Sequence, residues 1–135
     1  MKRTVVTMGL TALLLVQSNC TPADVDMPEP SEGAALFNQN CSVCHGANAD
    51  PSAGELSVSA PDLRQITTRN RGAFPRAAVL SQIDGYGRGR VGAEQMPEFG
   101  ALLEGELVPV EVEGIFTPTP RPLAALLAYL EDIQR

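Results

Sequence analysis

The stretch Cys41-Ser42-Val43-Cys44-His45 places two thiols three residues apart and an imidazole directly after the second thiol. The chain has 135 residues, three cysteines and a single histidine. Four kinds of site use a Cys-X-X-Cys pair: covalent haem attachment, a redox-active dithiol, a zinc site and a short disulfide. The residues around the pair distinguish these possibilities.

Covalent haem attachment is the interpretation that the rest of the chain favours. Two cysteines at this spacing near a helix end can reach two vinyl groups on one porphyrin edge, and the next histidine can ligate the iron. A thioredoxin-like dithiol needs a βαβ setting, but a loop rich in Ala, Asn, Gly and Pro follows at 46–54. Zinc needs four ligands, and a disulfide over three residues constrains almost nothing. We therefore expect one covalent haem c on Cys41, Cys44 and His45.

The first twenty residues predict export. Two basic residues precede a mostly apolar run over 5–16, which is too short to span a bilayer. Polar residues 17–19 close the run, and two processing routes then fit. Cleavage after Ser18 is one, and cleavage before Cys20 with lipidation, as in bacterial lipoproteins, is the other. The alternative for the apolar run is an ordinary buried helix. The alternative for Cys20 is a free thiol in a flexible tail.

The charge balance limits the partners. Loss of the two basic residues in 1–20 leaves eight basic residues against sixteen acidic ones, a net charge of −8. This acidity argues against nucleic acid and against electrostatic docking to anionic lipid, so we expect membrane contact only through a lipid anchor. Six arginines lie within 64–90 and six glutamates within 94–113. These two groups can be two solvated faces of the protein. Alternatively, the arginines bind the haem propionates and the glutamate-rich loop steers a partner protein. The candidate propionate ligands are Arg64 and Arg76, with Arg69 and Arg71.

Helical periodicity and turn residues predict an all-α fold with about three main helices and long loops. We expect a flexible tether over 21–32, with Ser31 as a helix N-cap, followed by one domain over 33–135. Most of 91–119 is predicted as loop. Residues 108–112 alternate weakly, which is typical of a short extended piece, but Pro109 forbids a central strand there. The predicted helices cover 33–41, 75–84 and 122–133, and a short helical turn runs from Pro61 toward Thr67.

The second axial ligand of the iron is sought by elimination. The chain has no second histidine and no lysine beyond residue 20, and Met27 and Met96 are the methionines beyond that point. We predict Met96, because Met27 lies in the tether and Pro97 stiffens the backbone next to Met96. A methionine can also fill a gap in a core, and an open site with bound water is the remaining alternative.

Four motifs together resemble class I c-type cytochromes of the bacterial periplasm, over about 31–100 and 120–135. The motifs are Gly33…Phe37…Cys41-X-X-Cys44-His45-Gly46, Pro61-Asp62-Leu63, Met96-Pro97-X-Phe99 and Leu127-Ala128-Tyr129-Leu130. The resemblance implies a cytochrome c-like fold in which the first and last helices cross, with Gly33 and Phe37 near Tyr129. It also implies that the Pro61 carbonyl accepts a hydrogen bond from Nδ1–H of His45.

These features predict a periplasmic electron carrier and no enzyme. An iron with both axial positions filled leaves no place for a small-molecule substrate. The expected partners are redox proteins, whose identity the sequence does not give. One alternative is a haem subunit of a larger respiratory or dehydrogenase complex, which predicts a hydrophobic patch on 101–119. Another is a haem-based sensor with an open sixth site.

Overall fold

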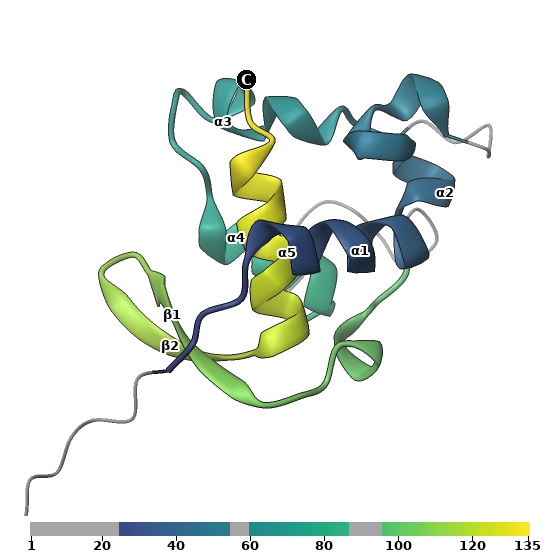
Figure 1. Ribbon diagram of the computed structural model, residues 1–135. Coiled ribbons are helices and arrows are strands. Elements are labelled where there is room, and N and C mark those ends of the chain that lie inside the picture. The colour runs from purple at the N-terminus through teal and green to yellow at the C-terminus, as the bar shows by residue number, and fades with distance from the viewer. Residues whose placement is uncertain (1–24, 55–59, 87–95) are drawn as a thin grey trace, which may run out of the picture.

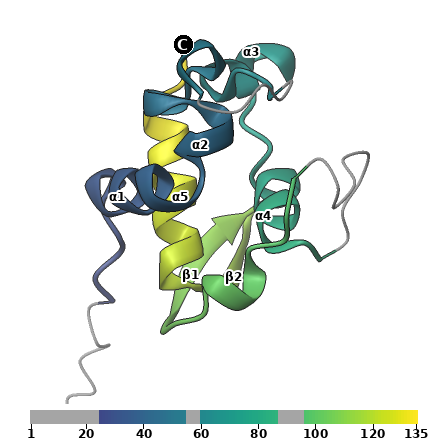
Figure 2. The same ribbon diagram turned by 90° about the vertical axis from the view of Figure 1, so that its right-hand side faces the viewer.

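The computed structural model describes residues 25–54, 60–86 and 96–135 and shows helices around a common core, with a small hairpin at one end (Figures 1 and 2). The longest helices are α1 (Pro30–Asn40), α4 (Arg76–Asp84) and α5 (Arg121–Asp132). They confirm the three predicted helices to within three residues at each end. The hairpin consists of β1 (Leu107–Val112) and β2 (Ile115–Pro120). The short elements are α2 (Ser42–His45), α3 (Ile66–Arg69), and the 3₁₀ turns η1 (Ala47–Ala49), η2 (Pro51–Ala53), η3 (Leu63–Gln65) and η4 (Gly100–Leu102).

Helix α1 begins earlier than predicted, and Ser31 is not its N-cap. Glu29 is the N-cap, and Pro30 occupies the first turn, where a missing N–H is tolerated and the fixed φ suits a helix. The Glu29 N–H donates to Oε1 of Glu32 at 3.1 Å. Arg121, at the start of α5, donates to the same carboxylate at 2.9 Å. The last three residues of the predicted tether therefore belong to the folded domain.

The crossing of α1 and α5 depends on Gly33. A Cβ atom at this position would collide with the Ala125 carbonyl oxygen and would lie 2.6 Å from Cβ of Tyr129. One turn later, Phe37 is buried, and its ring centroid lies 5.2 Å from that of Tyr129. This confirms the expected contact of the first and last helices.

A two-stranded antiparallel sheet occupies much of the region predicted as loop, so the all-α prediction was too narrow. Pro109 lies directly opposite Pro118. Opposite residues in an antiparallel pair alternate between hydrogen-bonded and non-bonded positions, and a pair of prolines fits only a non-bonded one. Pro120 follows Pro118 by two residues and therefore also occupies a non-hydrogen-bonded position. The prolines are tolerated because both strands are edge strands.

The hairpin is held by its turn and by α5. Glu113 and Gly114 form the turn with φ of 53° and 82°, the left-handed backbone that a two-residue hairpin loop requires. Val108 and Val110 are buried against Ala124 and Leu127 of α5. A second, larger cluster centres on Phe37, Leu126 and Tyr129 and joins α1, α4 and α5. No helix among the described residues is long and apolar enough to cross a membrane.

Candidate functional site

The Cys41–His45 segment is one helical turn that continues from α1. The Cys41 N–H donates to the Phe37 carbonyl at 2.8 Å, and the His45 N–H donates to the Cys41 carbonyl at 2.9 Å. Cys41 and Cys44 are three residues apart in this turn, so their side chains lie on the same side of it. Both thiols are half-buried and neither forms a disulfide. The turn thus presents two thiols along one edge.

The Cys41 thiol lacks the chemistry of a redox dithiol. Burial, with a smaller contribution from Cys44, raises the pKa of Cys41 to about 11. Reactive cysteines in oxidoreductases have a lowered pKa, because the thiolate is the nucleophile. At neutral pH this thiol is protonated, which favours the attachment interpretation over dithiol exchange.

His45 is held neutral in a largely apolar environment. Burial lowers the pKa of its imidazole, and the Pro61 backbone carbonyl acts in the opposite direction by raising it. Pro61 is therefore near the ring, but Nδ1 of His45 is buried with no hydrogen-bond partner in the described part of the chain. The expected hydrogen bond to the Pro61 carbonyl stays a prediction. A neutral imidazole is the form that ligates a metal, and a carbonyl partner on Nδ1 leaves Nε2 for the iron.

Apolar side chains extend from the core to this segment. The Phe37 ring centroid lies 6.4 Å from that of His45, and Cys41 packs against the same core cluster. Partly exposed apolar side chains border this cluster: Leu63, Phe74, Val79, Leu80, Met96 and Phe99. Such a half-covered apolar surface suits a flat apolar group bound beside the helices.

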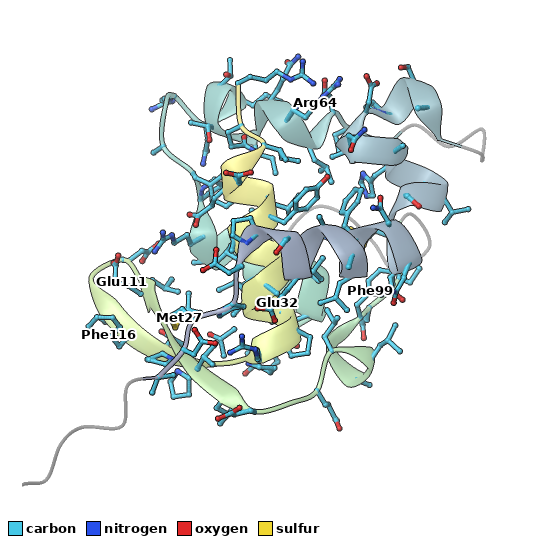
Figure 3. The ribbon with its side chains drawn as sticks, viewed as in Figure 1. Met27, Glu32, Arg64, Phe99, Glu111 and Phe116 are labelled. Atoms are coloured by element: carbon cyan, nitrogen blue, oxygen red, sulfur yellow. The ribbon has the colours of Figure 1, made fainter. Side chains whose placement is uncertain are left out.

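The structure separates the two candidate methionines. Met96 is half-buried against the cluster that includes Cys41, and Nε2 of Gln82 lies 3.7 Å from its sulfur. Met27 is 41% exposed and lies beside the hairpin, at the opposite end of the molecule from α2 (Figures 1 and 3). Of the two, Met96 is the one that packs against the core cluster that Cys41 also contacts. Its ligation of iron stays a prediction.

Arg64 forms ion pairs with two aspartates, Asp50 and Asp62. Its Nη1 lies 2.7 Å from Oδ2 of Asp50, and its Nη2 lies 2.7 Å from Oδ2 of Asp62. Asp50 belongs to the loop after His45, and Asp62 follows Pro61. The guanidinium thus joins the segment that carries His45 to the segment that carries Pro61. Its expected role toward a propionate stays a prediction. Sequence analysis placed Asp62 in a motif without giving it a role, and it did not single out Asp50.

Arg76 has partners on other elements. Its Nε donates to Oε1 of Glu131 at 2.6 Å, and its Nη1 donates to the Glu111 carbonyl at 2.8 Å. These bonds connect α4 to α5 and to β1, so Arg76 lies on the hairpin side of α5. The expected role of Arg76 toward a propionate also stays a prediction. Cys20, the predicted lipidation site, lies outside the residues that the structure describes. Both partners are glutamates, but nothing in the local sequence pattern marks them as neighbours of Arg76.

The family comparison covers the whole folded domain. The family model described as Cytochrome c matches residues 30–134, from the first residue of α1 to beyond the end of α5. No curated protein and no solved structure matches the chain significantly. Two thiols on one edge, a half-buried neutral imidazole and an apolar border are a set of groups that fits covalent haem. The chain therefore belongs to the cytochrome c family and carries one covalent haem c.

Proposed function

We propose that the protein is an exported electron carrier whose haem iron is ligated by His45 and Met96. The observation that carries the proposal is the position of Met96 on the apolar cluster that also contains Cys41, in a chain of the cytochrome c family. Met27, the other methionine beyond the predicted signal, is not among the residues that pack against that cluster and instead lines a hollow beside the hairpin.

The chain's own residues supply what an electron carrier requires. Cys41 and Cys44 make the cofactor permanent, so an exported protein does not lose it by dilution. A thioether ligand favours Fe(II) and raises the reduction potential relative to two nitrogen ligands. Phe37, Tyr129 and the apolar border exclude water from the site. With both axial positions occupied, the protein transfers electrons and has no catalytic site.

Replacement of Met96 by Ala tests the ligation. We expect the variant to lose the near-infrared sulfur-to-iron absorption band of the oxidised protein and to bind CO rapidly when reduced. Met27→Ala is the matched control and should keep the spectrum of the unchanged protein. Rapid and complete CO binding by the unchanged protein would instead support a haem-based sensor with an open site.

The location is part of the proposal. The basic start, the apolar run over 5–16 and Cys20 support export to the periplasm with a lipid anchor on that cysteine. Cys20→Ser should release the protein from the membrane fraction without changing its visible spectrum. Retention of the variant on membranes would contradict lipidation.

A second candidate function has its own support. A haem subunit of a larger oxidoreductase predicts a hydrophobic patch on 101–119, and four large apolar residues of this region are exposed. They are Leu102, Leu107, Ile115 and Phe116. Co-purification with a dehydrogenase or an oxidase from native membranes would distinguish a subunit from a free carrier.

A further inference from the structure

The outward face of the hairpin is apolar and exposed. Alternate residues of a strand point to opposite faces, and Val108 and Val110 of β1 face α5. Leu107 and Pro109 therefore face outward, as do Phe116 and Pro118, which lie opposite Glu111 and Pro109. Leu107 is 61% exposed and Phe116 is 72% exposed. We call these four residues (Leu107, Pro109, Phe116 and Pro118) the hairpin face.

A hollow adjoins the hairpin face. It has a volume of about 290 Å³ and lies between β1, α5 and the segment before α1. Met27, Pro109, Phe116 and Ala128 give it apolar walls, and the paired Arg76 and Glu131 lie at its border. Figure 3 shows Phe116 and Met27 next to one another on this side of the molecule. Interfaces commonly place an anchoring side chain of the partner in a hollow of this kind.

The prolines determine how a partner can approach. Residues at non-bonded positions direct their backbone nitrogen to the outer edge of the hairpin, and Pro118 and Pro120 have no N–H to offer there. A partner strand that paired with β2 would lack these donors. The outer edge of β2 is thus blocked, and the hairpin face with its hollow is the surface that remains.

Carboxylates surround the hairpin face. Glu104, Glu106 and Glu113 are exposed around it. The basic residues nearby are already in ion pairs, Arg76 with Glu131 and Arg121 with Glu32. An apolar centre with an acidic rim matches the anatomy of a protein interface whose partner has a basic rim. A lipid surface fits less well, because Glu113 is at the tip of the hairpin and Glu111 is beside Phe116.

We propose that the hairpin face is a docking surface for a protein that inserts an apolar side chain into the hollow and surrounds it with Arg or Lys. This inference extends the second candidate function. It does not depend on which residue ligates the iron. The hairpin lies at the opposite end of the molecule from α2 (Figures 1 and 2). A partner docked there holds the cytochrome and leaves the haem-bearing end available for electron exchange.

Photo-crosslinking of the holo-cytochrome in its native cells tests the proposal. A benzoylphenylalanine replaces Phe116 in one sample, and the matched control carries it at Gln39, an exposed residue of α1 that borders neither the hairpin nor the hollow. We expect position 116 to give one dominant crosslinked protein, at least fivefold above position 39. Glu113→Lys should reduce that product severalfold, whereas Asp132→Lys, at an exposed acid on α5, should not. The identified protein should present a basic rim around an apolar side chain.

Other outcomes would overturn the proposal. Equal crosslinking at positions 116 and 39, or none at 116, would show that the hairpin face docks no protein. A crosslink between two copies of this chain would indicate a dimer. Co-flotation with phosphatidylcholine vesicles that Phe116→Ser abolishes would indicate a lipid surface. A visible spectrum recorded on every sample separates these outcomes from a failure of the haem site.

Discussion

At the scale of single residues, Arg64 has a clear structural task near the haem site. It connects Asp50, in the loop that follows His45, to Asp62, which follows Pro61. The backbone N–H of Arg64 also donates to Oδ1 of Asp62 at 3.0 Å. The Pro61 carbonyl acts on His45, so a fixed Asp62 keeps the histidine and its backbone partner together. Arg64 is thus a positioning residue, whatever it contacts on the cofactor.

Stability at acidic pH should report this ion pair. Hydrogen bonds from Arg64 lower the pKa of Asp62 to about 2, from an ordinary value of 3.8. Because the folded-state pKa is the lower one, the pair stabilises the fold above pH 3.8, and this contribution is lost as the pH falls toward 2. We expect Asp62→Asn to melt at a lower temperature than the unchanged holo-protein at pH 7, with the difference vanishing near pH 2. Asp132→Asn is the control, and a difference that does not change with pH would contradict the assignment.

Sequence reasoning grouped residues that are close together in the chain. Cys41, Cys44 and His45 lie within five consecutive positions, so their grouping needs no tertiary information. Asp50 and Glu131 could not be found this way, because their arginine partners lie on segments that are distant in the sequence. Gly33 is an intermediate case. The resemblance to class I cytochromes placed it near the last helix, and the structure supplied the reason, which is a collision with Ala125.

At the scale of elements, the hairpin is an addition that α5 holds in place. Val108 and Val110 are buried on Ala124 and Leu127, and Arg76 joins β1 to α4 and α5. Helix α5 therefore packs against other elements on two sides. One carries the crossing with α1 that supports the haem site, and the other carries the hairpin.

Two substitutions on β1, one at a buried and one at an exposed position, should differ in the free energy of unfolding that they cost. Val108→Ala removes two methyl groups from a buried site, and we expect a loss of about 2 kcal/mol in the free energy of unfolding. Leu107→Ala, on the outward face of the same strand, should cost less than about 0.5 kcal/mol. Denaturant unfolding of the two holo-proteins measures both values. Similar losses would mean that the hairpin is not packed on α5 as described.

The helices were predictable from sequence, whereas only the first strand of the hairpin was, as a short extended piece over 108–112, and its pairing with β2 was not. The apolar residues of α5 recur with helical period over three turns, and a signal of that length overrides local ambiguity. The strands alternate over only six residues each and contain three prolines, which sequence reasoning reads as signs against a sheet. A two-stranded sheet has only edge strands, so the prolines cost it little.

At the scale of the whole molecule, the cofactor is part of the core. The chain has four phenylalanines, two tyrosines and no tryptophan. Aromatic rings usually supply a large share of the buried area in a small domain. Here several apolar side chains between the helices remain only partly buried by protein alone. Haem would cover such a surface, and thioether bonds from Cys41 and Cys44 would join it permanently to the turn after α1.

The protein without haem should therefore be much less stable than the holo-protein. In the variant Cys41→Ser/Cys44→Ser, freed of haem by extraction, the apolar border faces water and the buried His45 has no iron to ligate. A cofactor that binds only the folded state contributes its binding free energy to stability. A loss of several kcal/mol in a domain of this size lowers the melting temperature by at least about 15 °C. Circular dichroism at 222 nm (the helix signal) measures the transition, with holo Cys20→Ser as the control because it retains both attachment cysteines. A haem-free chain that melted cooperatively at the temperature of the control would show that the helices and the hairpin pack without the cofactor, and that haem is bound to a finished fold.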